Sequence, residues 1–407
     1  MSLKNTSRYI PILLIGAVVI FSCSKPANNL PNPPQPPPPP PPVAKPIDSA
    51  DMIYIAGGYS NDVYKINAQT GAVIWDKKVS GSLNTSAIYC NGRVVVKGRN
   101  MNITAFDTAG NVQWTYQMPG NTENPDDIAI VAKGGKVYAE DFEHIYAIGI
   151  NDGSVKWTYT KETHYDTLYY HDPNGSGTLI LQGNKVYVNN SSGNLYALDT
   201  ATGILQWESF TNAPLLAPVV YDKLIYFQTG YGIIWVIDAN TGTTLWMLND
   251  LSSVQINMKY GRIYDMNGSV RDSVTAIASY PSVQYPVLNY LTDGAVYPIL
   301  EDSLAIVPGA VCDAFTGQLL CSPDVAAGGL VNNGITYANH IVYYTTSQRE
   351  YYDPYTGGHW YSDAYAYDVN AKKLLWHTQI ENASFFNTEP CVVTRSGRVY
   401  RGAYSFK

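Results

Sequence analysis

The sequence contains few charged residues. They make up 14% of the 407 positions, the net charge is −7, and the 26 lysines and arginines are scattered along the chain. A nucleic-acid-binding protein normally carries a basic stripe, so this balance argues against a nucleic-acid partner. Helical periodicity is also missing, because no long segment after residue 25 repeats its apolar residues every 3.6 positions. The sequence therefore predicts an all-β protein.

Familiar catalytic and metal-binding patterns are missing as well. The six histidines form no H-E-x-x-H pattern, the cysteines show no zinc spacing, and neither a G-x-S-x-G elbow nor a phosphate loop occurs. His164 and His171 flank a tyrosine-rich stretch, where a solvated polar loop is a simpler interpretation than a metal site or an acid–base pair. We therefore predict no catalytic residue, no metal and no cofactor.

The N-terminus has the form of an export signal. An apolar run from Ile10 to Phe21 follows two basic residues and ends at Ser22-Cys23. A basic start, an apolar stretch of about 7–15 residues and a small residue before cleavage are typical of secretory signals. Ile20-Phe21-Ser22-Cys23 resembles a bacterial lipobox, which implies cleavage before Cys23 and lipidation of its sulfur. The alternative is an ordinary signal peptide that happens to contain a cysteine.

A proline-rich linker follows the signal. The segment Pro26–Pro46 contains an unbroken run from Pro36 to Pro42. Such a tract adopts polyproline II, rises about 3.1 Å per residue and acts as a semi-rigid spacer, although it could also be a ligand for SH3-type domains. No acidic cluster follows Cys23, which resembles outer-membrane sorting without surface export. We predict a signal peptide at 1–22, a lipidated linker at 23–50, and a periplasm-facing anchor in the outer membrane.

From Asp51 onward the sequence repeats one unit of two strands and a turn. Its clearest copy is Leu195–Trp207, where an alternating strand ends in Asp, Thr-Gly turns the chain, and a second strand carries Trp. Six of the eight tryptophans occupy this last position, which we call the tryptophan slot, and there they are predicted to fill the wedge between neighbouring sheets. The slot residues are Trp75, Trp114, Trp157, Trp207, Trp246 and Trp376.

Two more short strands precede each unit, so each repeat predicts one four-stranded blade of a β-propeller over residues 51–407. The gap between Trp246 and Trp376 holds one unit with Cys in the slot, Cys312–Cys321, and a worn unit at Val274–Pro286. Counting both predicts eight blades, and omitting the worn unit predicts seven. The strands near Pro390–Val393 and Arg398–Tyr404 are expected to pair with Val63–Trp75, so that N- and C-terminal strands close the ring.

The pattern Leu-Tyr-Ala-Leu-Asp-x-x-Thr-Gly-x-x-x-Trp resembles the repeat of pyrroloquinoline-quinone-binding-like propellers. This superfamily includes quinoprotein dehydrogenases and BamB-type outer-membrane lipoproteins. The dehydrogenases carry adjacent cysteines over the quinone and a calcium site, whereas no two cysteines are adjacent here and the domain is short. A quinone-dependent dehydrogenase is therefore disfavoured. The BamB-type resemblance implies a non-enzymatic scaffold that binds envelope proteins through its loops and acts in outer-membrane protein assembly.

Four cysteines lie in the predicted propeller. Cys312 and Cys321 flank one Thr-Gly turn, so either a cross-strand disulfide or two separate buried thiols fits the sequence. Cys90 and Cys391 lie near the two ends of the domain, where ring closure could bring them together.

Two aromatic insertions form the candidate binding face. They span Tyr159–Asp172 and Tyr351–Tyr361, and both are expected on the same face of the ring. Tyrosine and tryptophan beside Asp and His make amphipathic surfaces that suit protein partners or the sugar rings of a glycan, and self-packing of long loops is the alternative. The predicted contact residues are Tyr165, Tyr169, Tyr170, Tyr351, Tyr352, Tyr355, His359 and Trp360.

Overall fold

The computed structural model describes residues 51–407 with gaps. The gaps are 58–59, 84, 120–129, 142, 162–177, 190–192, 212–217, 230–232, 250–255, 260–261, 266–269, 273–298, 308, 324–333, 350–359, 382, 384–387, 402–403 and 407. Every element assigned within the described residues is a β-strand, in agreement with the all-β prediction. The signal peptide, the linker and Cys23 lie outside the described residues, so those predictions stay predictions.

The strands form separate antiparallel sheets. The first sheet joins both ends of the domain: β1 (Met52–Ala56), β2 (Asp62–Asn67), β3 (Val73–Lys78), β31 (Cys391–Val393), β32 (Val399–Arg401) and β33 (Tyr404–Phe406). Three sheets of four consecutive strands come next: β4 (Ile88–Cys90), β5 (Arg93–Lys97), β6 (Asn102–Asp107), β7 (Val112–Gln117); β8 (Ile130–Lys133), β9 (Lys136–Glu140), β10 (His144–Gly149), β11 (Val155–Thr160); β12 (Leu179–Gln182), β13 (Lys185–Asn189), β14 (Asn194–Asp199), β15 (Leu205–Phe210).

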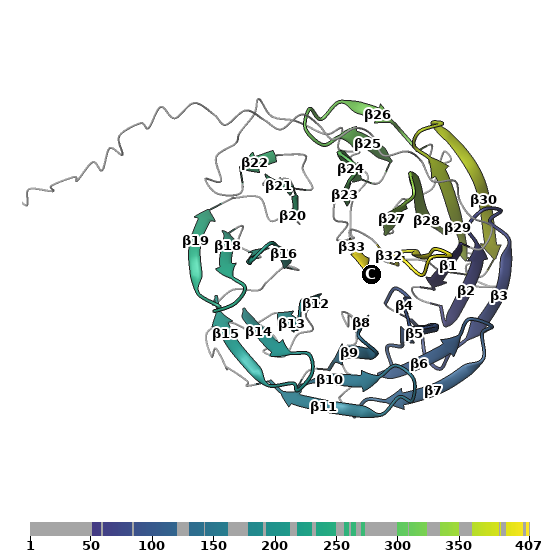
Figure 1. The fold of residues 1–407 in the computed structure, drawn as a ribbon. Coiled ribbons are helices and arrows are strands. Elements are labelled where there is room, and N and C mark those ends of the chain that lie inside the picture. The colour runs from purple at the N-terminus through teal and green to yellow at the C-terminus, as the bar shows by residue number, and fades with distance from the viewer. Residues whose placement is uncertain are drawn as a thin grey trace, which may run out of the picture. The chain divides into compact units, whose positions relative to one another are not determined.

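The second half of the chain continues the same order. Its four-stranded sheets are β16 (Val219–Tyr221), β17 (Leu224–Gln228), β18 (Ile233–Asp238), β19 (Thr244–Asn249); β23 (Ile299–Glu301), β24 (Leu304–Val307), β25 (Ala310–Asp313), β26 (Leu319–Cys321); β27 (Ile335–Ala338), β28 (Ile341–Arg349), β29 (Trp360–Asp368), β30 (Lys373–Glu381). Between them lies a three-stranded sheet of β20 (Ile256–Lys259), β21 (Arg262–Asp265) and β22 (Val270–Asp272). Figure 1 shows the sheets around a common centre, with the first strand of each four-stranded sheet innermost.

The prediction of eight four-stranded blades is wrong. Among the described residues, seven sheets have four strands or more, and the sheet β20–β22 has three. The predicted worn unit at Val274–Pro286 lies outside the described residues, so its placement stays a prediction.

The predicted closure of the ring also needs correction. Strand β31 pairs antiparallel with β1, placing Cys391 opposite Tyr54, and not with the predicted partner Val63–Trp75. Among the described strands, no hydrogen-bonded ladder runs from one sheet to the next. Within the described part of the chain, the ring is therefore not closed by backbone ladders between sheets, and contacts made by side chains join neighbouring blades.

The slot tryptophans provide these contacts. Trp157 illustrates the arrangement: its indole Nε1 donates a hydrogen bond of 3.2 Å to the carbonyl oxygen of Thr200 in the next sheet. Its ring covers Gly203, where a Cβ atom would lie 2.6 Å from a ring carbon. We call this contact of a slot tryptophan with the next sheet's carbonyl and glycine the tryptophan clamp. The other clamps join Trp75 to Thr108 and Gly110, Trp114 to Ile150 and Gly153, Trp207 to Ala239 and Gly242, and Trp376 to Ala68 and Gly71.

Three of the five clamped turns are built by the aspartate of the repeat, and Asn67 takes this role in the turn at Gly71. In the unit ending at Trp207, the Asp199 carboxylate accepts the backbone N–H groups of Ala201 and Thr202 at 3.0 and 2.9 Å, and Gly203 follows with a φ of 73°. These hydrogen bonds lower the pKa of Asp199, the N–H of Thr202 contributing most. The Asp-x-x-Thr-Gly spacing thus fixes where the glycine lies beneath the preceding tryptophan.

Candidate functional site

Most of the predicted aromatic face lies outside the described residues. Tyr165, Tyr169 and Tyr170 fall in the gap 162–177, and Tyr351, Tyr352, Tyr355 and His359 fall in the gap 350–359. Trp360 begins strand β29, but only its backbone is described. The contact roles of these side chains therefore stay predictions. What the structure does describe is the framework from which both insertions start.

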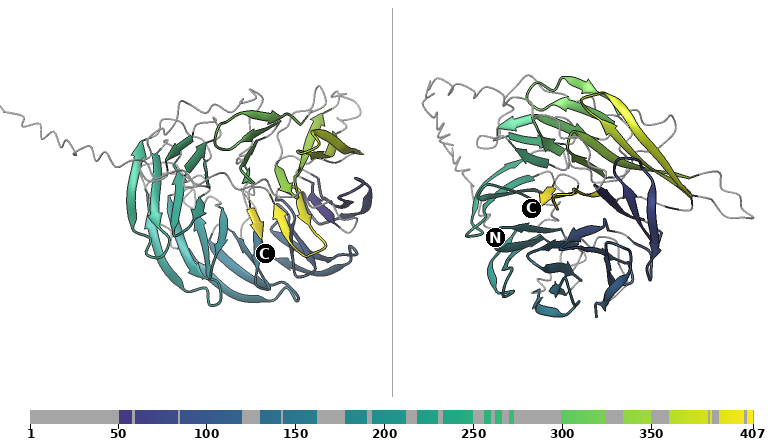
Figure 2. Two further views of the ribbon diagram at one scale, coloured as in Figure 1. Left: turned by 45° about the horizontal axis from the view of Figure 1, so that its top comes forward. Right: turned by 45° about the vertical axis from the view of Figure 1, so that its right-hand side comes forward.

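The second insertion starts from an elongated hairpin. Strands β28, β29 and β30 have nine residues each, whereas β13, β14 and β15 have five or six. The pairing of β28 with β29 runs without interruption from Ile341 opposite Asp368 to Arg349 opposite Trp360. Figure 2 shows these long strands at the yellow-green end of the colour scale. The hairpin of β28 and β29 therefore extends beyond the length of an ordinary blade strand.

A polar and aromatic ladder stiffens this hairpin. His377 Nε2 lies 2.8 Å from Asp363 Oδ1, and the Asp363 side chain is only 6% exposed. The His377 ring stacks on Tyr365 at a centroid distance of 4.6 Å, and Tyr365 stacks on Tyr344 at 4.7 Å. A buried carboxylate that bonds one ring nitrogen fixes the orientation of the imidazole. The sequence pattern missed this pair because only the pairing of β29 with β30 brings residues 363 and 377 together.

The first insertion starts from a buried charged cluster. Lys161, the last described residue before it, pairs with Glu140 Oε2 at 3.3 Å and donates to the carbonyl oxygen of Asp141 at 2.8 Å. Lys97, from the preceding sheet, donates to the carbonyl oxygen of Glu140 at 2.9 Å. All four residues are less than 5% exposed. Burial lowers the pKa of Lys97 to about 7, partly opposed by the charges of Glu140 and Asp141.

Asp141 fixes the turn between β9 and β10. Its carboxylate accepts hydrogen bonds from the Tyr146 hydroxyl at 2.7 Å and from the backbone N–H of His144 at 2.6 Å. The pKa of Tyr146 is raised, first by burial and then by its bond to Asp141. The sequence analysis missed this cluster, because its charged residues come from three separate segments of the chain. The sequence signal that could have indicated this cluster is a lysine or glutamate at the end of an otherwise apolar strand.

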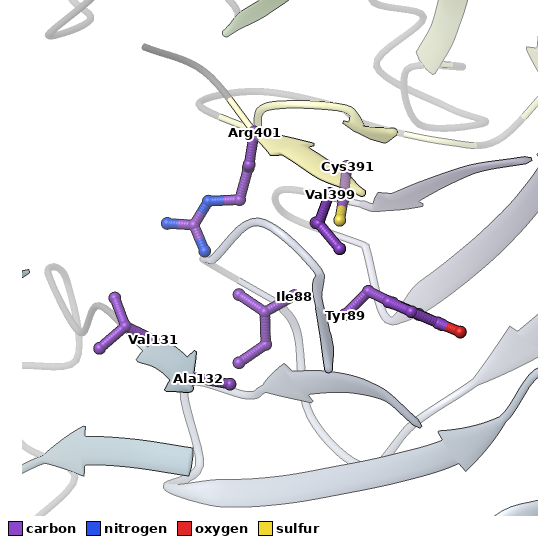
Figure 3. A pocket seen from close by; sticks show the side chains of 7 residues that line it. All are labelled: Ile88, Tyr89, Val131, Ala132, Cys391, Val399 and Arg401. Carbon is purple, nitrogen blue, oxygen red and sulfur yellow. The ribbon is translucent and has the colours of Figure 1, made fainter. Parts of the chain in front are cut away.

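A small cavity lies where the two ends of the domain meet. It is a shallow, partly open hollow between β4, β8, β31 and β32, and its walls are mainly apolar. Figure 3 shows Arg401 and Cys391 on its upper side, facing Ile88 and Val131. The Arg401 guanidinium donates to the carbonyl oxygen of Ile130 at 3.3 Å and pairs with Glu389 at 3.4 Å. Arg401 therefore ties the C-terminal strands to the sheet β8–β11.

The four cysteines of the domain are free thiols. Cys312 and Cys321 pack on opposite faces of their sheet, Cys312 beside Tyr264 and Cys321 beside Ile335, so no disulfide joins them. Burial raises the pKa of Cys391 to about 12, which keeps it protonated. Ring closure brings Cys391 to strand β4, where it packs beside Tyr89. Cys90 packs in a different cluster, toward β8 and β9.

Two further kinds of site are absent from the described parts of the chain. Nowhere in them do three His, Cys, Asp or Glu side chains come together as metal ligands would. No helix in the same residues has the length and apolar character needed to cross a membrane.

Sheets around a common centre, joined by tryptophan clamps on turns with a glycine at positive φ, define a β-propeller with pyrroloquinoline-quinone-like repeats. The family model of the outer membrane protein assembly factor BamB matches residues 38–246, slightly more than half of the chain. The chain belongs to this family. The matched region ends at the slot residue Trp246, and so includes five slot tryptophans.

Individual relatives are distant. The outer membrane protein assembly factor BamB of Moranella endobia (strain PCIT) is 25% identical over 202 residues, covering 48% of this chain and 50% of the relative. That of Yersinia pestis is 25% identical over 211 residues, covering 50% and 52%. The chain thus spans about half the length of these curated relatives. The structure of apo AztD from Citrobacter koseri has a TM-score of 0.55 at 12% identity, covering 87% of this chain and 99% of that one, which shows the fold alone.

Proposed function

We propose that the protein is a non-enzymatic scaffold of the bacterial envelope that binds other envelope proteins during the assembly of outer-membrane proteins. The observation that carries this proposal is membership of the BamB family over residues 38–246. The clamped ring supports it, because a rigid platform can present loops to a partner with little loss of conformational entropy. A lipid on Cys23 and the proline-rich spacer would hold the propeller at the periplasmic side of the outer membrane.

The two aromatic insertions are the proposed contact surface. One leaves the buried Lys161–Glu140 pair, and the other extends from the hairpin that Asp363 and His377 stiffen. Tyrosine and tryptophan are enriched at the centres of protein interfaces, because they combine a large apolar surface with a polar group. A rigid framework beneath aromatic loops suits recognition of a protein surface better than exposed clusters of charge would.

Site-specific photo-crosslinking tests this proposal. Benzoylphenylalanine placed at Tyr169, Tyr351 or Trp360 of the full-length protein in cells is expected to capture envelope proteins. The same probe at Gln113, on the outer strand β7, is the matched control, because it is exposed but distant in sequence from both insertions. Capture from Gln113 alone, or from none of the four sites, would refute the proposed contact surface.

The lipid anchor has its own test. Cys23→Ser should leave an unlipidated protein that fractionates away from membranes, and mass spectrometry of the wild-type N-terminus should find acyl chains on residue 23. An unmodified Cys23 in the mature protein, or a chain cleaved elsewhere, would exclude the lipid anchor. The family assignment would be unaffected.

Glycan binding is the second candidate function. It is favoured by one feature of the sequence: the segment 351–361 combines five tyrosine or tryptophan rings with His359 and Asp353. Titration of the protein with cell-wall and dietary polysaccharides, followed by tryptophan fluorescence, tests it. A saturable shift that Trp360→Ala abolishes would favour a glycan over a protein partner.

A further inference from the structure

The chain enters the propeller at a fixed point. Asp51, the first residue that the structure describes, is 4% exposed. Its carbonyl oxygen accepts the backbone N–H of Ala68 at 3.1 Å, and its carboxylate oxygen Oδ1 accepts the backbone N–H of Arg395 at 2.9 Å. Ala68 lies in the turn between β2 and β3, and Arg395 lies in the turn between β31 and β32. Asp51 is therefore held by its main chain and its side chain at the point where residues 1–50 join the ring.

Asp51 lies on the face of the ring that carries these short turns. Met52, the next residue, is opposite Asn67 on β2 and opposite Val393 on β31, so both turns adjoin the start of β1. Each tryptophan clamp joins the strand that follows one glycine turn to the glycine turn of the next sheet. The clamped turns therefore follow one another along a single face, which we call the turn face.

Both aromatic insertions start from the opposite face. The first leaves β11 at Thr160, which is opposite His144 on β10, and the clamped turn of this hairpin lies at its other end. The second lies between Arg349 and Trp360, which pair at one end of β28 and β29, and the other end of β29 leads into the turn before Trp376. We call the face defined by Thr160, Arg349 and Trp360 the insertion face.

The length of the linker can be compared with the thickness of the ring. At about 3.1 Å per residue, polyproline II over the residues between Cys23 and Asp51 would span about 80 Å. Strand β11 has six residues, and at about 3.3 Å per residue it separates the two faces by about 20 Å. The linker is joined to the turn face, so the insertion face lies on the far side of the ring from the attachment point.

We propose that the turn face is directed toward the membrane to which Cys23 is attached and that the insertion face points away from it. The proposed contact surface is then open to a protein in the aqueous periplasm, with neither the linker nor the bilayer in between. A partner embedded in the bilayer would have to reach this surface with a water-exposed domain or segment. This inference deepens the proposed function and rests on it, because it assumes the lipid anchor and gives the contact surface a direction.

Energy transfer to the membrane tests this direction. The full-length lipidated protein is reconstituted in vesicles of phosphatidylethanolamine and phosphatidylglycerol that contain a lipid-linked acceptor dye. A donor dye is coupled to azidophenylalanine at Asn151 or at Thr160, two exposed positions at opposite ends of the same blade. The donor at Asn151 should be nearer the plane of acceptors by up to about 20 Å, the length of β11. The Cys23→Ser protein gives the baseline without an anchor.

A change in the linker supplies a second measurement. When Pro36–Pro42 is replaced by alternating glycine and serine, both donors should move closer to the membrane, because a flexible chain has a shorter average span than polyproline II of the same length. The difference between the two donors should also become smaller, since the ring can then turn more freely. Unchanged distances in this variant would contradict the role given to the linker.

Other outcomes separate the direction from the proposed function. Equal transfer from Asn151 and Thr160, or stronger transfer from Thr160, would overturn the proposed direction. Absence of transfer from both positions would show that the protein is not held at the membrane, and the anchor would then fail together with the direction. If photo-crosslinking from Tyr169 captures envelope proteins while the two donors transfer equally, the scaffold proposal stands and the direction does not.

Discussion

The indole Nε1 of Trp157 lies 3.2 Å from the carbonyl oxygen of Thr200, 43 residues away in the next sheet. The same oxygen accepts the hydroxyl of Tyr138 at 3.1 Å and Lys136 Nζ at 3.0 Å. One backbone carbonyl is therefore the point where three side chains of one sheet attach to its neighbour. Lys185, Tyr187 and Trp207 converge on Ala239 in the same way.

These contacts explain how the ring is held without a continuous hydrogen-bonded ladder. A buried carbonyl must be hydrogen-bonded, and an indole N–H likewise needs an acceptor when its ring fills a wedge. The clamp satisfies both requirements at once while it buries the ring. It also makes the glycine beneath the ring a packing residue, in addition to a turn residue.

Substitution of a clamped glycine should be more damaging than substitution of an unclamped one. Gly203→Ala places a Cβ 2.6 Å from the Trp157 ring at a φ of 73°, whereas Gly183, with a φ of 59°, has no atom within 4 Å of an added Cβ. We expect Gly183→Ala to lower the free energy of unfolding by about 1 kcal/mol and Gly203→Ala by about 2–4 kcal/mol, since overpacking adds to backbone strain. Urea denaturation measures both, and equal losses would contradict the clamp.

Cys321 and Lys372 should behave as one coupled pair. Cys321→Trp alone should be strongly destabilising, because the new ring meets the Cβ of Lys372, which has a φ of 52°. Adding Lys372→Gly to the Cys321→Trp variant should restore part of the lost unfolding free energy. This gain should exceed the effect of Lys372→Gly in the wild-type protein by about 1 kcal/mol or more. A double-mutant cycle of unfolding free energies measures the coupling. Additive effects of the two substitutions would show that positions 321 and 372 are independent.

The repeat could be predicted from the sequence because each unit encodes its own turn. Asp199, Thr202 and Gly203 act within a few residues of one another, so spacing alone identified them. The number of complete blades was not predictable in the same way, because the sequence between Trp246 and Trp376 has no tryptophan in the slot. Spacing does not show which unit there completes four strands, as the Cys312–Cys321 unit does in β23–β26.

The framework beneath the insertions depends on contacts that spacing does not show. Lys97 meets Glu140 only because adjacent blades bring two strand ends together, and Asp363 meets His377 only through strand pairing. Each of these residues is common on protein surfaces, and its type alone gives no indication of burial. The aromatic residues of the insertions were predicted from composition, which indicates a contact surface but not its geometry.

The buried ion pair of Lys161 and Glu140 should contribute strongly to stability. Lys161→Met would leave the Glu140 carboxylate in a site where its side chain is 0% exposed. Removing one partner of a buried pair typically costs about 3–5 kcal/mol. Lys78→Met is the control, because Lys78 pairs with Asp62 at 3.5 Å with a side chain 72% exposed, where about 0–1 kcal/mol is expected. Equal losses in urea denaturation would show that the buried pair has no special role.

Lys97 should make stability rise with pH above neutrality. Burial lowers its pKa from 10.5 to about 7, so between these values the unfolded chain binds up to one proton more than the folded chain. The free energy of unfolding should then increase with pH, by at most about 1.4 kcal/mol per pH unit. Below pH 7 both states carry the charge, and this contribution no longer changes.

Lys97→Met removes the titrating amine while filling much of the same volume. Urea denaturation of wild type and variant from pH 6 to pH 9.5 should show a difference in unfolding free energy that shifts in favour of wild type as pH rises. Lys133→Met, at an exposed position, is the control and should run parallel to wild type. Parallel curves for Lys97→Met would mean that Lys97 keeps its charge in the folded protein. The charges of Glu140 and Asp141 would then outweigh the cost of burying its ammonium group.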